Sequence, residues 1–511
     1  MNKNHRVVWS EHRQAFVVAH EAATSRAPGP SSSSVSSVAK AVAALALSVA
    51  AHQATATPAC FASGSTLTIS ASQNYGCYLQ TGGSIVVNSG VSVTGDFAIV
   101  ADTAVAGSIQ NAGHLFGQFY SNTSSSSSGG GSAISIYNST VASITNTGTI
   151  QGDKIGIQVQ GGSVSGQITG DITNSALITG GDYGIYLAGT TVGGGISNSG
   201  TIHGGSDSAI YLEGTSITGA LHNTGTITSA GSGNTIYVRD GSTISGGIYN
   251  SGSIIGVSGD YDDAAIKVSN STIQNGITNT GSIGFTGTSE YAHGIFLDSA
   301  VVTGGITNSG TITAVAPSNS EAYGLGLNHT SVTGGVTNSG IISGGDNSTD
   351  DGWGVQLYSA HVDAIVNSGQ IYGVGNYNGY GIEVNSSTIT GGITNGGIIS
   401  GSSSGILVRY STITGSIVNQ ANGLITGIGA GIVVYDDGAI GGIRHCSGSA
   451  EARILDVLGC HAQALRRHQR LELQRDRRRD GICWQRHDLA VHGLEHTGRT
   501  PREPVRIPEW H

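Results

Sequence analysis

The sequence predicts an all-β protein whose main body is a right-handed parallel β-helix of about 13 coils. Three observations lead to this prediction. The 511 residues include 82 glycines and only 11% charged residues, a composition that does not suggest several ordinary globular domains. A phrase close to Ile-Thr-Asn-Ser-Gly-Thr-Ile, clearest at 306–312, recurs along the chain. Around these phrases Ile and Val alternate with polar residues, as in short strands. The handedness follows only from the chirality preference of parallel crossover connections.

The first 56 residues are typical of an export signal, which we divide into residues 1–24 and 25–56. Lys40, the apolar run 41–50 and the small residues 54–56 provide a charged start, a hydrophobic core and a cleavage site. We place the cleavage after Ala56, with Ala51 as the alternative. The apolar run is too short to cross a bilayer as a helix. An ordinary buried helix is the other interpretation of this run.

The segment ahead of the apolar core has a pattern that ordinary signal peptides lack. It reads MNKNHRVVW over residues 1–9, followed by FVVAHE over residues 16–21. This segment resembles the extended signal peptide region of Gram-negative type V secreted proteins, the autotransporters and their two-partner relatives. The resemblance implies passage through the inner membrane by the Sec translocon, a periplasmic stage, and then display outside the cell.

Cys60 and Cys77 follow the export signal, separated by 16 residues. In an oxidising compartment they can close a small loop, and such a disulfide contributes about 3 kcal/mol in the chain-entropy model. We predict this disulfide, with two unpaired thiols as the alternative.

The Asn of each repeated phrase marks one coil. Asn88 and Asn111 mark the first two phrases, and from Asn146 onward the markers are 24 to 30 residues apart, a spacing typical of a supersecondary unit that stacks on itself. At a fixed corner each Asn can hydrogen-bond the coils above and below, so we expect a structural ladder rather than a ligand site. The predicted ladder comprises Asn146, Asn174, Asn198, Asn223, Asn250, Asn279, Asn308, Asn338, Asn367, Asn395 and Asn419.

One coil divides into three short strands, as the copy from Ala265 illustrates. Ile266 and Val268 belong to the first strand, Ile273 and Ile277 to the second, and Ile283 to the third. Coils stacked about 4.8 Å apart would join these residues into a continuous apolar column. Extra residues fall mainly between the third strand of one coil and the first strand of the next, at 121–131, 284–293 and 344–352. We expect loops there, on one side of the rod.

The repeat stops at Ile443, so we assign residues 57–443 to the β-helix. Residues 444–511 contain 13 Arg, 7 His and 3 Cys, whereas Lys154, Arg239, Lys267 and Arg409 are the only Lys and Arg of the body. We interpret this abrupt change as a shift of reading frame at or near Arg444, which would make the tail disordered. A genuine basic tail is the alternative.

The search for catalytic and ligand sites predicts no enzyme, no cofactor and no metal. The acid pairs at 262–263, 350–351 and 436–437 lie in separate coils, and Gly401 to Gly405 is a serine-rich turn rather than a nucleophile elbow. The six histidines of the body lack metal-ligand spacing, and the acidic body is a poor candidate for nucleic-acid binding. Those histidines are His114, His203, His222, His293, His329 and His361.

The export segment and the Gly-rich repeats together resemble a monomeric autotransporter over residues 1–443. The resemblance implies a surface-displayed passenger acting as an adhesin or a self-association factor, with host glycans, matrix or a like rod as the partner. We recognise no C-terminal barrel of that family here, so the expected location is the cell surface or outer membrane if a barrel is supplied, and the periplasm otherwise. A carbohydrate-active β-helix enzyme and a truncated passenger without function remain the alternatives.

Overall fold

The computed structural model describes residues 5–10, 15–20, 60–119, 130–161, 166–258, 262–288, 291–447, 457–459, 474–476 and 482–489. The chain forms two units, Met1–Thr57 and Pro58–His511. In the first unit β1 (His5–Ser10) pairs with β2 (Ala15–His20) as an antiparallel hairpin. The predicted cleavage site at Ala56 and most of the tail lie outside the described residues. Within the described residues, no helix has the length and hydropathy to cross a membrane.

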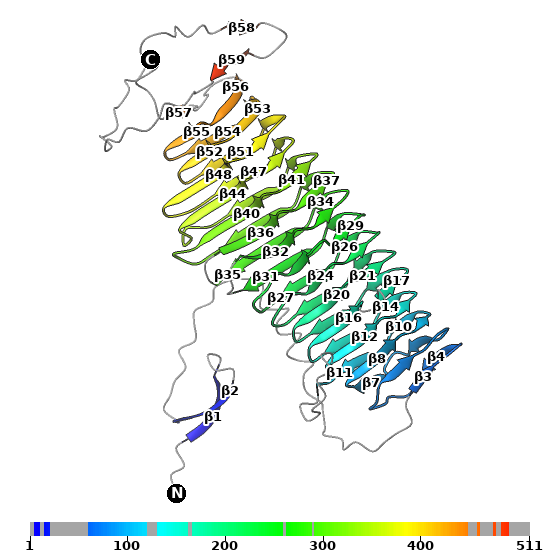
Figure 1. Cartoon of the computed structure of the whole chain (residues 1–511). Helices are drawn as coiled ribbons and strands as arrows, with labels where there is room; N and C mark the ends of the chain where they lie inside the picture. The colour runs from blue at the N-terminus through cyan, green and yellow to red at the C-terminus, as the bar shows by residue number, and fades with distance from the viewer. Residues whose placement is uncertain are drawn as a thin grey trace. The chain divides into compact units, whose positions relative to one another are not determined.

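The second unit is a parallel β-helix, which confirms the predicted fold class (Figure 1). Its strands form sheets of 16, 28 and 13 strands, here called the first, second and third sheets. Each regular coil gives one strand to the first sheet, two short strands to the second and one to the third.

The first sheet consists of β3 (Cys60–Ala62), β5 (Cys77–Leu79), β8 (Phe97–Asp102), β12 (Ser132–Tyr137), β16 (Ile155–Gln160), β20 (Tyr183–Ala188), β24 (Ile210–Glu213), β28 (Ile236–Arg239), β32 (Asp263–Ser269), β36 (Tyr291–Asp298), β40 (Glu321–Asn328), β44 (Asp351–Tyr358), β48 (Asn378–Asn385), β52 (Ser404–Arg409), β55 (Ala430–Tyr435) and β57 (Val457–Gly459). The third sheet consists of β7 (Ser92–Gly95), β11 (His114–Gly117), β15 (Thr149–Gly152), β19 (Leu177–Gly180), β23 (Thr201–Gly204), β27 (Thr226–Ser229), β31 (Ser253–Ser258), β35 (Ser282–Gly287), β39 (Thr311–Val315), β43 (Ile341–Gly344), β47 (Gln370–Gly373), β51 (Ile398–Gly401) and β54 (Leu424–Gly427).

The second sheet consists of β4 (Thr66–Ile69), β6 (Ser84–Val87), β9 (Val105–Ala106), β10 (Ile109–Asn111), β13 (Thr140–Val141), β14 (Ile144–Asn146), β17 (Gly166–Ile168), β18 (Ile172–Asn174), β21 (Thr190–Val192), β22 (Ile196–Asn198), β25 (Ser216–Ile217), β26 (Leu221–Asn223), β29 (Thr243–Ile244), β30 (Ile248–Asn250), β33 (Thr272–Ile273), β34 (Ile277–Asn279), β37 (Val301–Thr303), β38 (Ile306–Asn308), β41 (Ser331–Thr333), β42 (Val336–Asn338), β45 (His361–Val362), β46 (Ile365–Asn367), β49 (Thr388–Ile389), β50 (Gly392–Asn395), β53 (Thr412–Asn419), β56 (Ala439–Ser447), β58 (Gln474–Asp476) and β59 (Ile482–Leu489).

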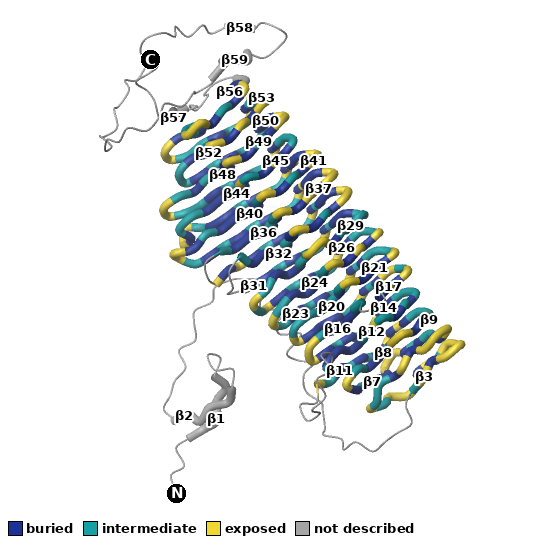
Figure 2. Tube along the Cα trace, viewed as in Figure 1, coloured by how far each residue is buried: buried dark blue, intermediate teal, exposed yellow. Residues whose placement is uncertain are grey.

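The core is a stack of branched side chains inside the coil. In the coil of β32 to β35 the predicted inward residues Ile266, Val268, Ile273, Ile277 and Ile283 are all buried. The same positions are occupied by apolar residues in neighbouring coils, which produces the buried stripes along the rod in Figure 2. Each fully buried Ile or Val contributes about 1.5–3 kcal/mol, and no coil could gain this alone because its apolar face needs a neighbour.

The predicted second strand is in fact two strands. Ile273 ends β33 and Ile277 begins β34, and both strands lie in the second sheet. Between them Asn275 and Gly276 have φ angles of 60° and 80°. This left-handed backbone interrupts the extended conformation, so the strand bends without leaving its sheet.

The first Asn marker was wrong. Val87, rather than Asn88, pairs with Asn111 in the register of the second sheet, and Asn88 is exposed. The turn from β6 to β7 contains residues 88–91, whereas the turn from β10 to β11 contains only residues 112–113. The longer turn carries Asn88 out of the column.

The expected loop at 284–293 is mostly strand. β35 runs to Gly287 and β36 begins at Tyr291, because the alternation of the third strand continues and Phe285 is buried. The extra residues therefore widen the coil. The predicted loop at 344–352 is a shorter turn between β43 and β44.

Strand β56 of the second sheet continues beyond the predicted boundary at Ile443. β56 runs to Ser447. Arg444 and His445 still pair with Val418 and Asn419 of β53.

Candidate binding face

The predicted Asn residues form one buried column inside the rod. Each amide nitrogen donates to the amide oxygen of the next Asn at 2.7–2.8 Å, from Asn111 through to Asn419. The same nitrogen lies within hydrogen-bond distance of a turn carbonyl of its own coil, as in Asn308 to Gly310 at 3.1 Å. At the end of the column, His445 Nδ1 lies 3.3 Å from Asn419 Nδ2. This column faces no solvent and holds the coils in register.

A second polar column, absent from the sequence-based prediction, lies at the corner between the first and second sheets. Buried hydroxyls accept the backbone N–H of the preceding coil, as Ser242 does from Thr215 at 3.0 Å and Ser411 does from Ser387 at 2.9 Å. The sequence does contain a signal, because a small hydroxyl residue stands two positions before an inward Val or Ile in most coils. The hydroxyls that accept such a bond belong to Ser139, Ser242, Ser271, Thr330, Ser387 and Ser411, and the buried Thr190 and Thr215 stand at the same position in their coils.

Cys60 and Cys77 form a disulfide with a Cα–Cα distance of 4.4 Å. They pair directly across β3 and β5 at the start of the first sheet. Phe61 and Tyr78 pair beside them and their exposed rings stack with centroids 5.6 Å apart. The disulfide therefore fastens the first coil to the next.

The histidines and the serine-rich turn do not assemble into a catalytic group. His114, His203 and His222 lie in strands of the third and second sheets, His329 and His361 lie near the corner between the first and second sheets, and His293 lies in the first sheet. Gly401 to Gly405 is the turn from β51 into β52. Within the ranges described, no three His, Cys, Asp or Glu side chains are placed to hold a metal ion.

The outer face of the first sheet is the chemically distinctive surface of the rod. One outward column in register contains Tyr186, Tyr211, Tyr237, Lys267, Phe296, Gly326, Gln356 and Glu383. The second sheet presents mainly small polar side chains at its outward positions, such as Thr278, Thr307 and Thr337 in register. The sequence-based prediction missed this face. The sequence does contain a signal for it, because a tyrosine stands between two inward residues at 185–187, 210–212 and 236–238.

Four tyrosines form a cluster in β20, β24 and β28. The Tyr186 and Tyr211 rings are 5.2 Å apart and nearly parallel, and Tyr237 meets Tyr211 edge-on at 5.6 Å. The Tyr183 hydroxyl donates to the Asp207 carboxylate at 2.7 Å. Burial is the largest cause that raises the pKa of Tyr183, and it raises the pKa of Tyr211 to about 12. The Tyr183 and Tyr211 phenols therefore stay protonated at neutral pH and can donate hydrogen bonds.

A column of aromatic rings fills a bend in the longer strands β36, β40 and β44. Gly294 and Ile295 both turn toward the core, so His293 and Phe296 share the outer face and stack at 4.2 Å. Tyr323 stacks on His293 at 4.6 Å and Trp353 stacks on Tyr323 at 4.5 Å. His293, Tyr323 and Trp353 are only 3%, 6% and 7% exposed. Because the ring faces cover one another, this column is a rigid wall rather than a platform for a flat ligand.

Two carboxylates stand beside this wall. Glu321 and Asp351 are paired in register on β40 and β44, each two residues before an aromatic of the column. The Tyr323 hydroxyl donates to Glu321, and Asn378 donates to Asp351 through its backbone and its side chain. Burial, together with the neighbouring charge of Asp351, raises the pKa of Glu321 despite the bond from Tyr323.

Asp262 lies beside His293, the first ring of this aromatic column along the chain. Its carboxylate is 3.8 Å from Nε2 of His293, and Lys267 Nζ donates to its backbone carbonyl at 2.8 Å. Burial lowers the pKa of His293, an effect that Asp262 partly opposes. His293 is therefore neutral at physiological pH.

On β48 and β52 the face contains an ion pair between the buried Glu383 and the partly exposed Arg409. Arg409 Nη2 lies 2.7 Å from Glu383 Oε1, and Gln356 Nε2 donates to the other oxygen at 3.2 Å. The Glu383 side chain is buried, so Arg409 provides the charge that this carboxylate requires.

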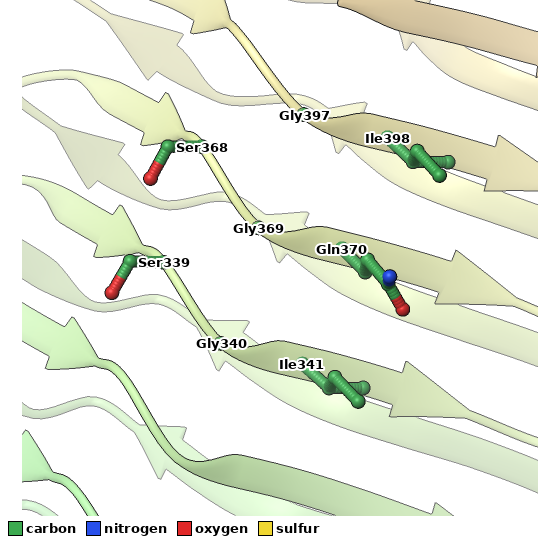
Figure 3. Close-up of a pocket in the computed structure, with 8 residues that line it drawn as sticks. All are labelled: Ser339, Gly340, Ile341, Ser368, Gly369, Gln370, Gly397 and Ile398. Carbon is green, nitrogen blue, oxygen red and sulfur yellow. The ribbon is translucent and has the colours of Figure 1, made fainter.

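A shallow groove lies on another part of the rod, at the corner between the second and third sheets (Figure 3). Glycines stack there because a Cβ on Gly340 would lie 2.0 Å from the carbonyl oxygen of Gly310. Serine side chains line one side and larger side chains line the other. No charged side chain lines it, so we assign it no role in ligand binding. Its lining consists of Ser339, Gly340, Ile341, Ser368, Gly369, Gln370, Gly397 and Ile398.

Comparison with known proteins identifies the N-terminal segment. Residues 1–51 match the family model described as the extended signal peptide of the type V secretion system. No curated protein and no solved structure matches the chain. The chain thus joins an extended signal peptide of type V secretion, which directs export across the inner membrane, to a parallel β-helix of the autotransporter-passenger type.

Proposed function

We propose that the secreted β-helix is an adhesin, or a self-association factor between cells, and that the outer face of the first sheet is its binding face. The observation that supports this assignment is the concentration of tyrosines and paired charges on that one face, in register along β20 to β52. Aromatic residues and Arg are enriched at protein interfaces, where they provide most of the binding energy.

The repeating architecture suits weak, multivalent contacts. Coils about 4.8 Å apart present similar groups many times along one line. Linked weak sites reach a higher avidity than any single contact provides. A long polymer or a second rod can engage many coils at once, so a deep pocket is not required.

The test displays the full chain on cells with a homologous barrel supplied. The double variant Tyr211→Ser/Tyr237→Ser removes two rings from the face, and Tyr249→Ser removes a half-buried tyrosine from the second sheet as the matched control. We expect adhesion to host cells, or aggregation, to fall in the double variant and to persist in the control. Mixing expressing and non-expressing cells separates the two functions, because self-association requires the chain on both. Equal behaviour of the two variants would refute the assigned face.

One observation supports a second candidate, a carbohydrate-active enzyme. Glu321 and Asp351 lie on adjacent coils, and the strand spacing of about 4.8 Å is close to the carboxyl separation of about 5–5.5 Å in retaining glycosidases. Glu321, with its raised pKa, would be the acid and Asp351 the nucleophile. Release of reducing ends from a polysaccharide panel, abolished by Glu321→Gln, is the required result. No release from any polysaccharide by the wild-type chain would eliminate this candidate.

A further inference from the structure

The chain contains four Asn-Gly pairs, at Asn275, Asn378, Asn395 and Asn422. Asparagine is chemically labile in proteins, and it loses its amide most readily before glycine, because no side chain then shields the backbone nitrogen that attacks it. Whether a given pair reacts depends on how firmly the fold holds the asparagine side chain and that nitrogen. The four pairs differ in this respect.

Asn395–Gly396 is held on both sides. Asn395 is fully buried in the asparagine column, where its amide nitrogen donates to Asn419 Oδ1 at 2.8 Å and its amide oxygen accepts from Asn367 at 2.8 Å. The Gly396 N–H donates to the carbonyl oxygen of Asn367 in the preceding coil at 2.7 Å. The amide carbon and the attacking nitrogen therefore cannot meet unless this part of the column opens first.

Asn422–Gly423 is the same pair one coil later, in a different setting. The turn from β50 to β51 contains only residues 396–397, whereas the turn from β53 to β54 contains residues 420–423. Asn422 is exposed in this longer turn, and its side chain has no hydrogen-bond partner among the described residues. The Gly423 N–H donates to Gln420 O within the same turn at 2.9 Å, a bond that can break without disturbing a neighbouring coil.

The fold also requires the residue that makes this turn reactive. A Cβ on Gly423 would lie 2.4 Å from Asn419 Oδ1 and 2.5 Å from the carbonyl oxygen of Asn395, so a larger residue would displace the end of the asparagine column. Packing therefore demands glycine at this position, and glycine leaves the nitrogen beside Asn422 unshielded.

We propose that Asn422 is a site of spontaneous deamidation in the folded protein, with water as the co-reactant. The Gly423 backbone nitrogen attacks the Asn422 amide carbon, a C–N bond forms, and the side-chain nitrogen leaves as ammonia with the proton of the Gly423 amide. The resulting cyclic succinimide then takes up water. Opening at one carbonyl gives aspartate, and opening at the other gives isoaspartate, in which the main chain runs through the side-chain carboxyl.

Asn378–Gly379 is held as firmly as the pair in the column. The Asn378 amide nitrogen donates to the Asp351 carboxylate at 3.0 Å, and the Gly379 N–H donates to Ser403 Oγ at 3.2 Å. The two partners lie in different neighbouring coils, so the side chain and the nitrogen are fixed independently of each other.

Asn275–Gly276 is the intermediate case. Asn275 is exposed, but its amide nitrogen donates to the carbonyl oxygen of Ser245 in the preceding coil at 2.8 Å. This bond must break before the side chain can turn toward the backbone nitrogen. We therefore expect Asn422 to react first and Asn275 next, with the two held pairs last.

Deamidation would change the end of the asparagine column. Asn419 Nδ2 donates to the Gly423 carbonyl oxygen at 2.8 Å. Isoaspartate at position 422 adds a methylene group to the backbone of the turn, which shifts this acceptor. We expect the isoaspartyl form to show faster hydrogen exchange in β54, which follows the turn, than the unmodified chain.

The experiment incubates the full, exported chain at mildly alkaline pH and follows each pair by peptide mass spectrometry, with electron-transfer fragmentation to distinguish aspartate from isoaspartate. Asn395 should react at least about 100-fold more slowly than Asn422, because its buried hydrogen bonds must first open. The same chain unfolded in urea is the matched control, in which the two rates should agree within about threefold because the structural protection is gone. Asn422→Gln should abolish the modification in this turn and keep β54 protected during the incubation.

Equal rates at Asn395 and Asn422 in the folded chain would overturn the inference, and so would reaction at Asn275 ahead of Asn422. A folded-state rate at Asn422 more than about tenfold below its rate in urea would also overturn it, because the turn would then protect the pair. Unchanged exchange in β54 after isoaspartate has formed would refute the effect on the column. The rates are measured on the wild-type chain, so they do not depend on how a variant folds.

Discussion

Replacement of Asn308 by Ala tests how the coils hold their register. The Asn308 amide nitrogen donates to Asn338 Oδ1 at 2.8 Å and to Ile341 O at 3.0 Å, and Asn308 Oδ1 accepts from Asn279 at 2.8 Å. Each net hydrogen bond contributes about 1 kcal/mol, and each buried partner left unsatisfied costs about 1–3 kcal/mol. Since both flanking Asn residues lose a partner, we expect a local cost of about 3–5 kcal/mol.

The assay must report on single coils, because a solenoid need not unfold in one step. Hydrogen exchange measured by mass spectrometry on peptides covering β34, β38 and β42 provides this resolution. At about 1.4 kcal/mol for each factor of ten, exchange through local opening should accelerate roughly 100-fold or more in these coils and remain unchanged near β14.

Asn88→Ala is the matched control, because Asn88 is exposed and outside the column. Its effect should stay within about 0.5 kcal/mol. If Asn308→Ala accelerates exchange no more than Asn88→Ala does, the Asn column is not what holds the coils together and the argument above is wrong.

Three further predictions follow from the same contacts. Reduction of the Cys60–Cys77 disulfide should destabilise the first coils by about 3 kcal/mol, seen as faster proteolysis near residue 62 and no change near the middle of the rod. The folded-state pKa of His293 lies below its unfolded value of 6.5, so its stabilising contribution is complete above pH 6.5 and declines as pH falls through the folded pKa. Denaturation midpoints at pH 7.5 and 5 should therefore differ less in His293→Phe than in the wild type. Gly310→Ala should be strongly destabilising because the new Cβ would lie 2.0 Å from a backbone oxygen, whereas Gly284→Ala meets only a hydroxyl at 3.5 Å and should be tolerated, as thermal melts can verify.

The sequence predicted the fold because its composition, the spacing of its repeats and its alternation of apolar and polar residues all indicated the same structure. Ile266, Val268, Ile273, Ile277 and Ile283 were expected inside, and all are buried. A repeat of this type leaves little ambiguity, since one misplaced residue would turn an apolar side chain outward.

The candidate face was harder to predict because it depends on where the coils bend. Gly294 turns toward the core and thereby brings His293 and Phe296 onto one side. Glu321 and Asp351 are 30 residues apart, and only the coil register makes them neighbours. To predict such neighbours one must know the number of residues in each coil. Stretches that resembled loops in the sequence, such as 284–293, hid that number.

The direction of the asparagine column has a consequence for how such rods can change over generations. Every asparagine offers an oxygen to the coil before it and an N–H to the coil after it, so each coil presents the same complementary pair of surfaces to its neighbours. A duplicated segment such as 280–308 would meet a matching donor at one junction and a matching acceptor at the other. Recombination between repeats can therefore lengthen or shorten the rod by whole coils while leaving both ends correctly joined, and the number of coils becomes a trait on which selection can act directly.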